Sequence, residues 1–398
     1  MQTVVSIPSE KLPQALALVR ASDVDVWLTF VRETSSGGDP ILPYFLAGGL
    51  TWPSALLITK SGKKIAVLGN YDADPLVASG DWDEVIPYVQ GISGALLEVL
   101  EREVSPGGRI AVNFSANDEK ADGLSHGMFL MLEQILHGTR FEGSLVTAEQ
   151  IAGDLRGRKS PEEMRRILFA VAQTQELFSE LGNYTKIGMS ERHLFDWIHE
   201  RVEQRGFGFS WDPEGDPIVN SGPESMVGHG IPSVSIHLQL GHVFHVDLGL
   251  TIDHYSSDLQ RCWFVGDAVP SDVSDALHAV NGAISVAAAV LKPGAIAWEI
   301  DAAAREYLVG RGYPEYLHAT GHQVGRLAHD GGTLLGPRWE RYGNSVMGPI
   351  KEGEVYTLEL GVFLEHRGYL GIEEMVFITE EGASWLSERQ WEMGLISS

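Results

Sequence analysis

Short apolar runs alternate with helical patterns over the first part of the chain. Apolar runs bounded by polar turns are typical of buried strands, and they occur at residues 26–30, 55–59, 64–68, 84–88 and 109–114. Helical patterns occupy residues 12–20 and 94–102. The Gly-containing turn at 60–63 joins two of the strands into a hairpin. The pattern predicts an α/β domain, and we identify no catalytic motif in it.

A domain boundary is predicted near residue 155. Residues 154–159 form a charged, Gly-containing joint. The next four residues, Ser-Pro-Glu-Glu at 160–163, supply an N-cap, a first-turn proline and the first-turn acids of a helix. We therefore expect two domains, at residues 1–155 and 156–398.

Beyond the boundary, the order of elements repeats. Four helices are predicted, at residues 161–181, 190–205, 271–291 and 298–311. Each pair of helices precedes a strand–turn–strand segment with two acids, Asp247 and Asp258 in the first and Glu359 and Glu373 in the second. The repeat predicts a duplicated helix–helix–hairpin domain, in which the two hairpins meet across a pseudo-twofold axis and bring their acids together.

Composition and charge exclude several classes of protein. The chain has 398 residues, of which 44% are hydrophobic and 21% charged, which is ordinary for a globular protein. Its net charge of −25 argues against a nucleic-acid partner, because the phosphate backbone is bound by clustered Lys and Arg. The single cysteine, Cys262, fits a reducing compartment. The N-terminus does not read as a signal peptide, and the longest mild apolar run, at 283–291, is short for a membrane span, so we expect a cytoplasmic protein.

The first pair of acids indicates either a metal site or an ordinary ion pair. Asp247 lies inside an apolar strand, where an ionised carboxylate needs a partner. Asp258 begins the return strand, so a hairpin would place it beside Asp247. A cation between the two would remove their repulsion. The alternative is one solvated turn acid and one ion pair with Arg261.

The second pair of acids and a group of histidines favour the metal site. Glu359 and Glu373 each lie in an apolar strand, and Glu374 must face the side opposite to Glu373 because strand side chains alternate. Three histidines lie between the two hairpins, beside glycines that allow close backbone approach: His318, His322 and His329. Four acids and one histidine form an oxygen-rich ligand set, which suits Mn²⁺ or a similar ion, and two metals rather than one. Such a pair generates a hydroxide nucleophile near neutral pH, so the residues alone indicate a hydrolase.

The order of these residues resembles the pita-bread metallopeptidases, which include prolidase, aminopeptidase P and methionine aminopeptidase. The resemblance covers about residues 155–385 and rests on Asp247-Leu248-Gly249, Ser257-Asp258, Gly321-His322, Glu359-Leu360-Gly361 and Ile372-Glu373-Glu374. It implies a fold of class α/β plus α+β, with a creatinase-like N-terminal domain followed by a pita-bread catalytic domain. It also implies that Asp258 and Glu373 bridge two metals, that Asp247 chelates one of them, and that His322 and Glu359 complete the other.

The same resemblance implies roles for residues around the metals. Glu359 would take the proton from the attacking water. His229, which follows an Asn-Ser-Gly-Pro segment, and His329 would hold the substrate carbonyl and stabilise the oxyanion. His318 would bind substrate from the pocket wall. The alternative interpretation is that His318 only packs against its neighbours.

Three positions depart from the family pattern. Many prolidases and aminopeptidases P have a Tyr and an Arg where this chain has Phe363 and Gly371, so the contacts of that pair are missing or are made by another group. Arg367 lies on the same strand face as Gly371 by parity, so it is a candidate to replace the missing Arg. The alternative is that the Arg367 side chain is only solvated. Gln260 replaces the usual Thr beside Asp258, so the hydrogen bonds around the ligands are expected to differ. Cys262 is expected to be a small buried residue rather than a redox group.

The resemblance points to metal-dependent hydrolysis of the Xaa-Pro imide bond in dipeptides by an Xaa-Pro dipeptidase (prolidase), with Mn²⁺ favoured and Co²⁺ or Zn²⁺ as alternatives. The alternatives are an Xaa-Pro aminopeptidase that acts on longer peptides and, in a different class, an inactive creatinase-like binding module. A dipeptidase must bind the substrate carboxylate, normally through Arg, and we assign this role to Arg32 from either subunit. The resemblance also implies a homodimer, in which residues 1–155 serve substrate access and dimerisation.

Overall fold

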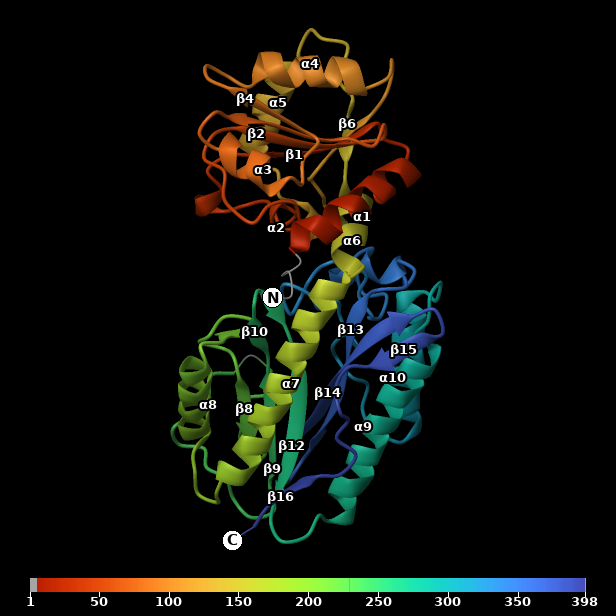
Figure 1. Ribbon diagram of the computed structural model, residues 1–398. Coiled ribbons are helices and arrows are strands. Elements are labelled where there is room, and N and C mark those ends of the chain that lie inside the picture. Colours follow the sequence, from red (N-terminus) through yellow and green to blue (C-terminus); the bar gives the residue numbers. More distant parts are fainter. Residues whose placement is uncertain (1–5, 229, 398) are drawn as a thin grey trace. The chain divides into compact units, whose positions relative to one another are not determined.

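The computed structural model describes residues 6–228 and 230–397 (Figure 1). The chain divides into two compact units, of which the first ends at Arg156 and the second begins at Gly157. Each unit has sheets of its own.

The N-terminal unit is built on a six-stranded sheet in the order β4-β3-β2-β1-β5-β6. Its strands are β1 Val26–Val31, β2 Ser54–Thr59, β3 Lys64–Gly69, β4 Glu84–Tyr88, β5 Ile110–Val112 and β6 Leu145–Thr147. The strand β2 is antiparallel to both of its neighbours, and the other neighbouring pairs are parallel. The five strands predicted for this part of the chain all form, including the β2–β3 hairpin. Both β1 and β2 are buried along their whole lengths, as continuous apolar runs predict for a sheet covered on both faces.

Helices pack on this sheet (Figure 1). They are α1 Ile7–Ala21, α2 Leu42–Phe45, α3 Ala73–Ser79, α4 Ser93–Glu103, α5 His126–Leu136 and α6 Glu149–Gly157, with 3-10 turns at Thr34–Ser36 and Glu119–Ala121. The apolar faces of α4 and α5 share one core with side chains of β1, β2 and β3. The helix predicted at 12–20 begins earlier, at Ile7, because the Ser6 side chain caps it by accepting from the backbone of Ser9. The charged joint predicted at 154–159 is helical as far as Gly157, the end of α6.

The C-terminal unit has a seven-stranded sheet in the order β13-β14-β12-β9-β8, with β15 added beside β14 and β16 beside β12. Its strands are β8 Ile218–Ser221, β9 Val243–Leu248, β12 Leu259–Val265, β13 Val355–Leu364, β14 Gly368–Thr379, β15 Gly382–Trp385 and β16 Gly394–Ile396. A separate three-stranded sheet contains β7 Gly208–Phe209, β10 Leu250–Ile252 and β11 Tyr255–Ser256. The two predicted hairpins meet where β12 pairs with β14.

The four helices predicted for this unit all form: α7 Pro161–Tyr184, α8 Glu191–Arg205, α9 Ser271–Val290 and α10 Ala297–Gly310. A capping box between Ser160 and Glu163 begins α7, as the sequence predicts. Short 3-10 turns lie at Glu340–Tyr342 and Ser345–Met347. By length and composition α9 is apolar enough to cross a membrane. Its apolar side instead shares a core with α10 and with β13 and β14 of the sheet, so α9 is the central core helix of this unit.

Candidate metal centre

Four neighbouring strands place polar side chains in one row across the C-terminal sheet. Glu359 on β13 lies opposite Glu373 on β14, Glu373 lies opposite Gln260 on β12, and Gln260 lies opposite Asp247 on β9. Asp258 precedes Gln260 by two positions, so its side chain points to the same side. The intervening positions of β13 and β14, such as Leu358, Leu360 and Ile372, pack into the apolar core. The pairing of strands therefore gathers four acids that are far apart in the sequence.

The segment at residues 320–324 brings a histidine to this row. It runs beside β13, where Thr357 N donates to His322 O at 2.9 Å and Glu359 N donates to Thr320 O at 2.8 Å. Any side chain at position 321 would collide with the carbonyl oxygen of Thr357, so the close approach of the two backbones requires Gly321. The glycine therefore places His322 beside the strand that carries Glu359.

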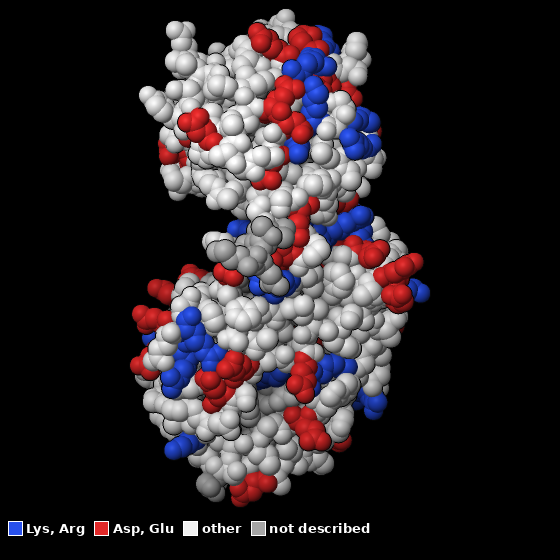
Figure 2. All heavy atoms as spheres, viewed as in Figure 1, with Lys and Arg blue, Asp and Glu red and all other residues white. Residues whose placement is uncertain are grey.

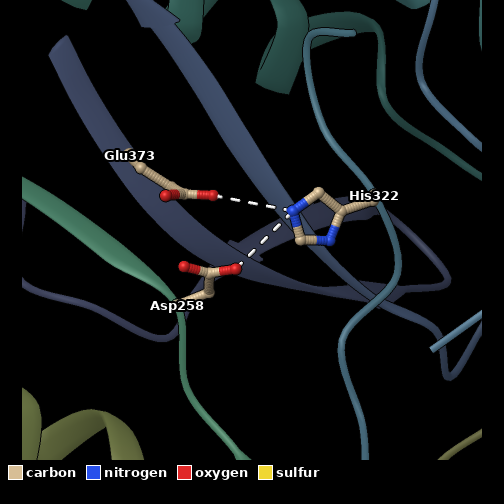
Figure 3. Close-up of side chains that lie close together, drawn as sticks. All are labelled: Asp258, His322 and Glu373. Atoms are coloured by element: carbon tan, nitrogen blue, oxygen red, sulfur yellow. Dashed lines mark ion pairs between the residues drawn. The ribbon is translucent and has the colours of Figure 1, made fainter. Parts of the chain in front are cut away.

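Asp258, His322 and Glu373 converge on one point, and their potential ligand atoms all lie within 4.8 Å of one another (Figure 3). His322 Nε2 lies 3.6 Å from Asp258 Oδ2 and 3.9 Å from Glu373 Oε1. The same nitrogen lies 3.9 Å from Glu359 Oε1. The side chains of Asp258, His322 and Glu373 are buried. The structure therefore brings together three of the five predicted ligands, with Glu359 beside them.

The protonation of His322 leaves a lone pair facing the acids. Its Nδ1 lies 3.1 Å from the carbonyl oxygen of Ala328 and 3.4 Å from that of Gln323. A carbonyl only accepts, so Nδ1 carries the hydrogen and Nε2 is an acceptor in the neutral ring. Burial, aided by the charge of His329, lowers the pKa of His322 to about 3. An acceptor nitrogen that faces three carboxylates is stable when a cation lies between them.

Among the described residues, the acids of this row have no cationic partner. Burial raises the pKa of Asp247, Asp258 and Glu373 well above their usual values, and their mutual repulsion raises it further. Burial also raises the pKa of Glu359, to about 7. Asp247 Oδ1 is buried and has no hydrogen-bond partner among the described residues. A divalent cation would satisfy this unpaired oxygen and the repelling carboxylates together, so the residues fit a metal centre.

The alternative explanation of the first acid pair, an ion pair with Arg261, is wrong. Arg261 Nη2 lies 3.0 Å from Glu374 Oε2 instead. Glu374 also accepts from the Ser387 hydroxyl at 2.5 Å and from the backbone of Gln390 at 3.0 Å. Glu374 therefore faces away from Glu373, as strand alternation predicts, and its charge is neutralised on that other side.

Two of the predicted histidines flank the cluster. The exposed His329 packs its ring 4.3 Å from the ring of His322. The ring of His318 lies 5.6 Å from that of Tyr316, whose hydroxyl lies 3.5 Å from Glu359 Oε2. His318 is exposed rather than packed in a core. Tyr316 was not predicted, because no motif marks it.

His229 lies outside the described residues, and the structure therefore gives it no place. In the N-terminal unit, Arg32 is exposed and lines a cavity of about 1130 Å³ together with aromatic side chains, among them Trp52, Tyr71 and Tyr88. The stretch after Arg32 forms a 3-10 turn at Thr34–Ser36, and the backbone of residues 33 and 34 is hydrogen-bonded to residues 51 and 50.

The structure gives a steric reason for one of the departures from the family pattern and shows the surroundings of the others. A Cβ atom at Gly371 would lie 2.5 Å from Gln260 Oε1 and 2.6 Å from Tyr369 Cε1, so no side chain fits there. The side chain of Phe363 is 48% exposed. Arg367 donates to Asp272 Oδ2 at 3.0 Å and to Gly241 O at 3.0 Å, so it is held by those two groups rather than solvated. Cys262 is buried and burial raises its pKa to about 12, which fits a packing residue.

Comparisons with known proteins agree with this geometry. Residues 165–380, which include all five candidate ligands, match the model of metallopeptidase family M24. An Xaa-Pro dipeptidase of Pyrococcus furiosus is 31% identical over 247 residues, which cover 62% of this chain and 67% of that protein. The crystal structure of the dipeptidase PepE from Mycobacterium ulcerans matches with a TM-score of 0.75 at 23% identity, and covers 98% of both chains. That of an X-Pro aminopeptidase from Thermotoga maritima matches with a TM-score of 0.70 at 22% identity, over 97% of this chain and 99% of the other.

These matches confirm the predicted fold class, a creatinase-like N-terminal domain followed by a pita-bread domain. The family model spans more than half of the chain and contains the whole cluster of acids around His322. The chain is a member of metallopeptidase family M24.

Proposed function

We propose that this metallopeptidase hydrolyses the Xaa-Pro imide bond and that Xaa-Pro dipeptides are its preferred substrates. The observation that carries the proposal is the convergence of Asp258, Glu373 and Glu359 on the neutral His322. The chain is also 31% identical to a protein named an Xaa-Pro dipeptidase over most of that protein's length.

Two divalent cations, with Mn²⁺ favoured and Co²⁺ or Zn²⁺ as alternatives, would be held by the predicted ligands: Asp247, Asp258, His322, Glu359 and Glu373. Bound cations of this kind polarise the scissile carbonyl and lower the pKa of a bound water. Asp258 and Glu373, whose carboxylates face the same nitrogen of His322, would be the ligands that the two cations share, as the family resemblance implies. Glu359 would accept the proton of the attacking water at a carboxylate oxygen.

The chemistry of the bond fits a site of this kind. The nitrogen of an Xaa-Pro bond carries no hydrogen and its φ angle is fixed, so a peptidase cannot hold the bond through an N–H donor. Polarisation of the carbonyl oxygen needs no such donor. His229 and His329 would hold that oxygen and stabilise the tetrahedral oxyanion, and His318 would contact the substrate from the pocket wall.

Residues 1–155 are assigned to substrate access and dimerisation in a cytoplasmic homodimer. Arg32, which is exposed in a cavity with aromatic walls, would bind the substrate carboxylate from its own or a partner subunit. The second candidate function, Xaa-Pro aminopeptidase activity on longer peptides, is favoured by the likeness to the Thermotoga maritima X-Pro aminopeptidase. The third candidate, an inactive binding module, is disfavoured because all five ligand positions hold a residue that can bind a metal.

A comparison of substrates tests the proposal. The full chain, loaded with Mn²⁺, is given Ala-Pro and Ala-Pro-Ala at equal concentrations, with a metal-stripped sample as the control. We expect Ala-Pro to be cleaved with the higher kcat/KM, and only in the presence of metal. Preferential cleavage of Ala-Pro-Ala would establish the aminopeptidase instead, and a chain that binds no stoichiometric metal and cleaves neither would be a binding module.

A further inference from the structure

Gln260 lies in the middle of the row of acids, and its side-chain amide joins two of them. Gln260 Nε2 donates to Glu359 Oε2 at 3.1 Å and to Glu373 Oε2 at 3.0 Å. The side chain is buried, with 5% of the residue exposed. Both hydrogens of one amide group are therefore used on two carboxylates from different strands.

These two hydrogen bonds, together with the Tyr316 hydroxyl 3.5 Å from Glu359 Oε2, orient the carboxylates so that their other oxygens face His322. The second oxygens, Glu359 Oε1 and Glu373 Oε1, each lie 3.9 Å from His322 Nε2. A carboxylate with one oxygen fixed by a donor has its other oxygen fixed too, because the group is planar. The amide of Gln260 thus aims one oxygen of each acid at the same point.

His245 fixes the orientation of the amide. Its Nε2 lies 3.0 Å from Gln260 Oε1. Since the two carboxylates only accept, the amide must turn its nitrogen toward them and its oxygen toward His245. In the neutral ring Nε2 then carries the hydrogen, and Nδ1, which lies 3.3 Å from Asn220 Oδ1, does not. The acids therefore hold the nitrogen end of the amide, and His245 holds its oxygen end. The ring of His245 is itself held edge-on against Tyr369, with the ring centres 4.9 Å apart.

The glycine at position 371 gives this arrangement its space. A Cβ atom there would lie 2.5 Å from Gln260 Oε1 and 3.1 Å from His245 Nε2. Any larger residue would push apart the two groups that form the hydrogen bond. A threonine in place of Gln260 would carry a single hydroxyl hydrogen and could donate to only one of the two acids.

We propose that Gln260 is a positioning residue of the metal centre, which presets Glu359 and Glu373 for cation binding, and that His245 holds its amide in the required orientation. The inference rests on the proposed function only in that the cluster binds a divalent cation. Residues that orient metal ligands in this way typically change metal affinity by about 10–100-fold when they are replaced.

The test is a calorimetric titration of the full, metal-stripped chain with Mn²⁺ alone. Gln260→Met keeps the length of the side chain and removes both donors, and we expect Mn²⁺ affinity to fall about 10–100-fold. An affinity within twofold of the unmodified chain would overturn the inference. If the unmodified chain itself binds no Mn²⁺, the proposed function fails, which is a different result.

Stability measurements separate positioning from a merely structural role. For Gln260→Met we expect the rise in Tm on addition of Mn²⁺ to become smaller than in the unmodified chain, whatever the Tm of the metal-free variant. Asn281→Leu is the matched control, because it removes a buried amide that bonds to backbone oxygens of Leu277 and Gln390. It should lower Tm and leave the affinity for Mn²⁺ unchanged.

A pair of variants at His245 gives a second test that does not depend on the folding of Gln260→Met. His245→Phe keeps a ring and removes the donor, and should weaken Mn²⁺ binding about tenfold. His245→Gln restores an N–H near the position of Nε2 and should recover most of the affinity. Equal affinities for the two variants would show that His245 does not orient the amide.

Discussion

Acidic side chains are neutralised in opposite ways in the two units. In the N-terminal unit, Lys63 lies 3.0 Å from Glu84 and Arg102 lies 2.7 Å from the same acid. The hydrogen bond from Lys63 is the main cause that holds the pKa of Glu84 below its usual value. Figure 2 shows basic and acidic side chains next to one another on the visible face of this unit. The charge of Glu84 is therefore balanced by basic groups of the chain itself.

In the C-terminal unit, the acids that face His322 are not balanced. Within the described part of the chain, the ion-pair contacts of Asp258, Glu359 and Glu373 all involve His322, whose lowered pKa keeps it neutral. The contrast is sharpest along β14, where Glu374 is paired with Arg261 and its neighbour Glu373 has no cation. Since an uncompensated charge is costly inside a fold, the imbalance marks the place where a cation from solution completes the structure.

The largest effect is expected when the unbalanced acids are changed. Asp258→Asn or Glu373→Gln should abolish tight Mn²⁺ binding and Ala-Pro hydrolysis, a loss beyond the ~100-fold of an outer-shell change. Each substitution removes an anionic ligand and adds an amide that repels a cation. Calorimetric titration and an Ala-Pro hydrolysis assay measure the two losses.

The matched control is the neighbouring acid. Glu374→Gln leaves Arg261 buried beside a neutral group, which should lower the free energy of unfolding by about 3–5 kcal/mol and leave Mn²⁺ affinity within a few-fold. Activity retained in Asp258→Asn or Glu373→Gln would contradict the metal assignment. A loss of affinity in Glu374→Gln, with the fold intact, would remove the distinction between the two faces of β14.

The second effect is a pH dependence of the metal-free chain. Burial raises the pKa of Glu359 from 4.5 to about 7. A group whose pKa is higher in the folded state stabilises the fold fully below pH 4.5, and this stabilisation is lost as the pH rises through 7. The loss amounts to about 3 kcal/mol by pH 8. His322 acts in the opposite direction, because its lowered pKa removes stability as the pH falls below 6.5.

A difference measurement isolates Glu359 from His322. Denaturant unfolding with chelator present is compared for Glu359→Gln and the unmodified chain at pH 4.5 and pH 8. We expect the variant to gain about 3 kcal/mol relative to the unmodified chain between these two values. Mn²⁺ should raise the Tm of the unmodified chain more at pH 8 than at pH 5, because protons compete with the metal. A difference that does not change with pH would mean that folding does not raise the pKa of Glu359.

The sequence predicted those parts of the site that local patterns encode. Asp247, Glu359 and Glu373 stand out because each interrupts an apolar strand, and Gly321 stands out because it precedes a histidine. The Ser160 cap and the first helix after it follow from short-range chemistry alone. Such features depend only on residues that are close along the chain, so they can be predicted from the sequence.

The contacts of Gln260 could not be predicted, because they depend on the register between strands. Gln260 meets Glu373 only because β12 pairs with β14 at that position. No local pattern sets this register, and the sequence marked Gln260 only as a departure from a family motif. Tyr316 was missed for the same reason, since its hydroxyl approaches Glu359 from a loop without regular structure. Long-range side-chain contacts are therefore what the structure adds.

The third effect concerns Arg32, a cation of the N-terminal unit that forms no ion pair with an acid among the described residues. Arg32→Ala should raise the KM for Ala-Pro about tenfold, the loss expected for one hydrogen bond between charged groups, without lowering metal content. Ala-Pro amide, which lacks the carboxylate, should be cleaved equally by both forms. Arg109→Ala, which removes an exposed arginine near Asp23, is the control and should leave KM unchanged. An unchanged KM in Arg32→Ala would exclude Arg32 from substrate binding.

The smallest effect is expected where charge is already balanced. Arg102→Met removes the guanidinium from Glu84 and Glu103, but the arginine side chain is 46% exposed, and Lys63 remains 3.0 Å from Glu84 and 3.6 Å from Glu103. Exposed pairs of this kind contribute about 0.2–1 kcal/mol, and salt screens them. Urea unfolding should therefore show a small loss of stability that shrinks at high salt, while Mn²⁺ affinity stays the same. A loss of several kcal/mol would mean that this ion pair contributes more to stability than an exposed pair does. A change in Mn²⁺ affinity would mean that the charges around Glu84 influence the metal centre.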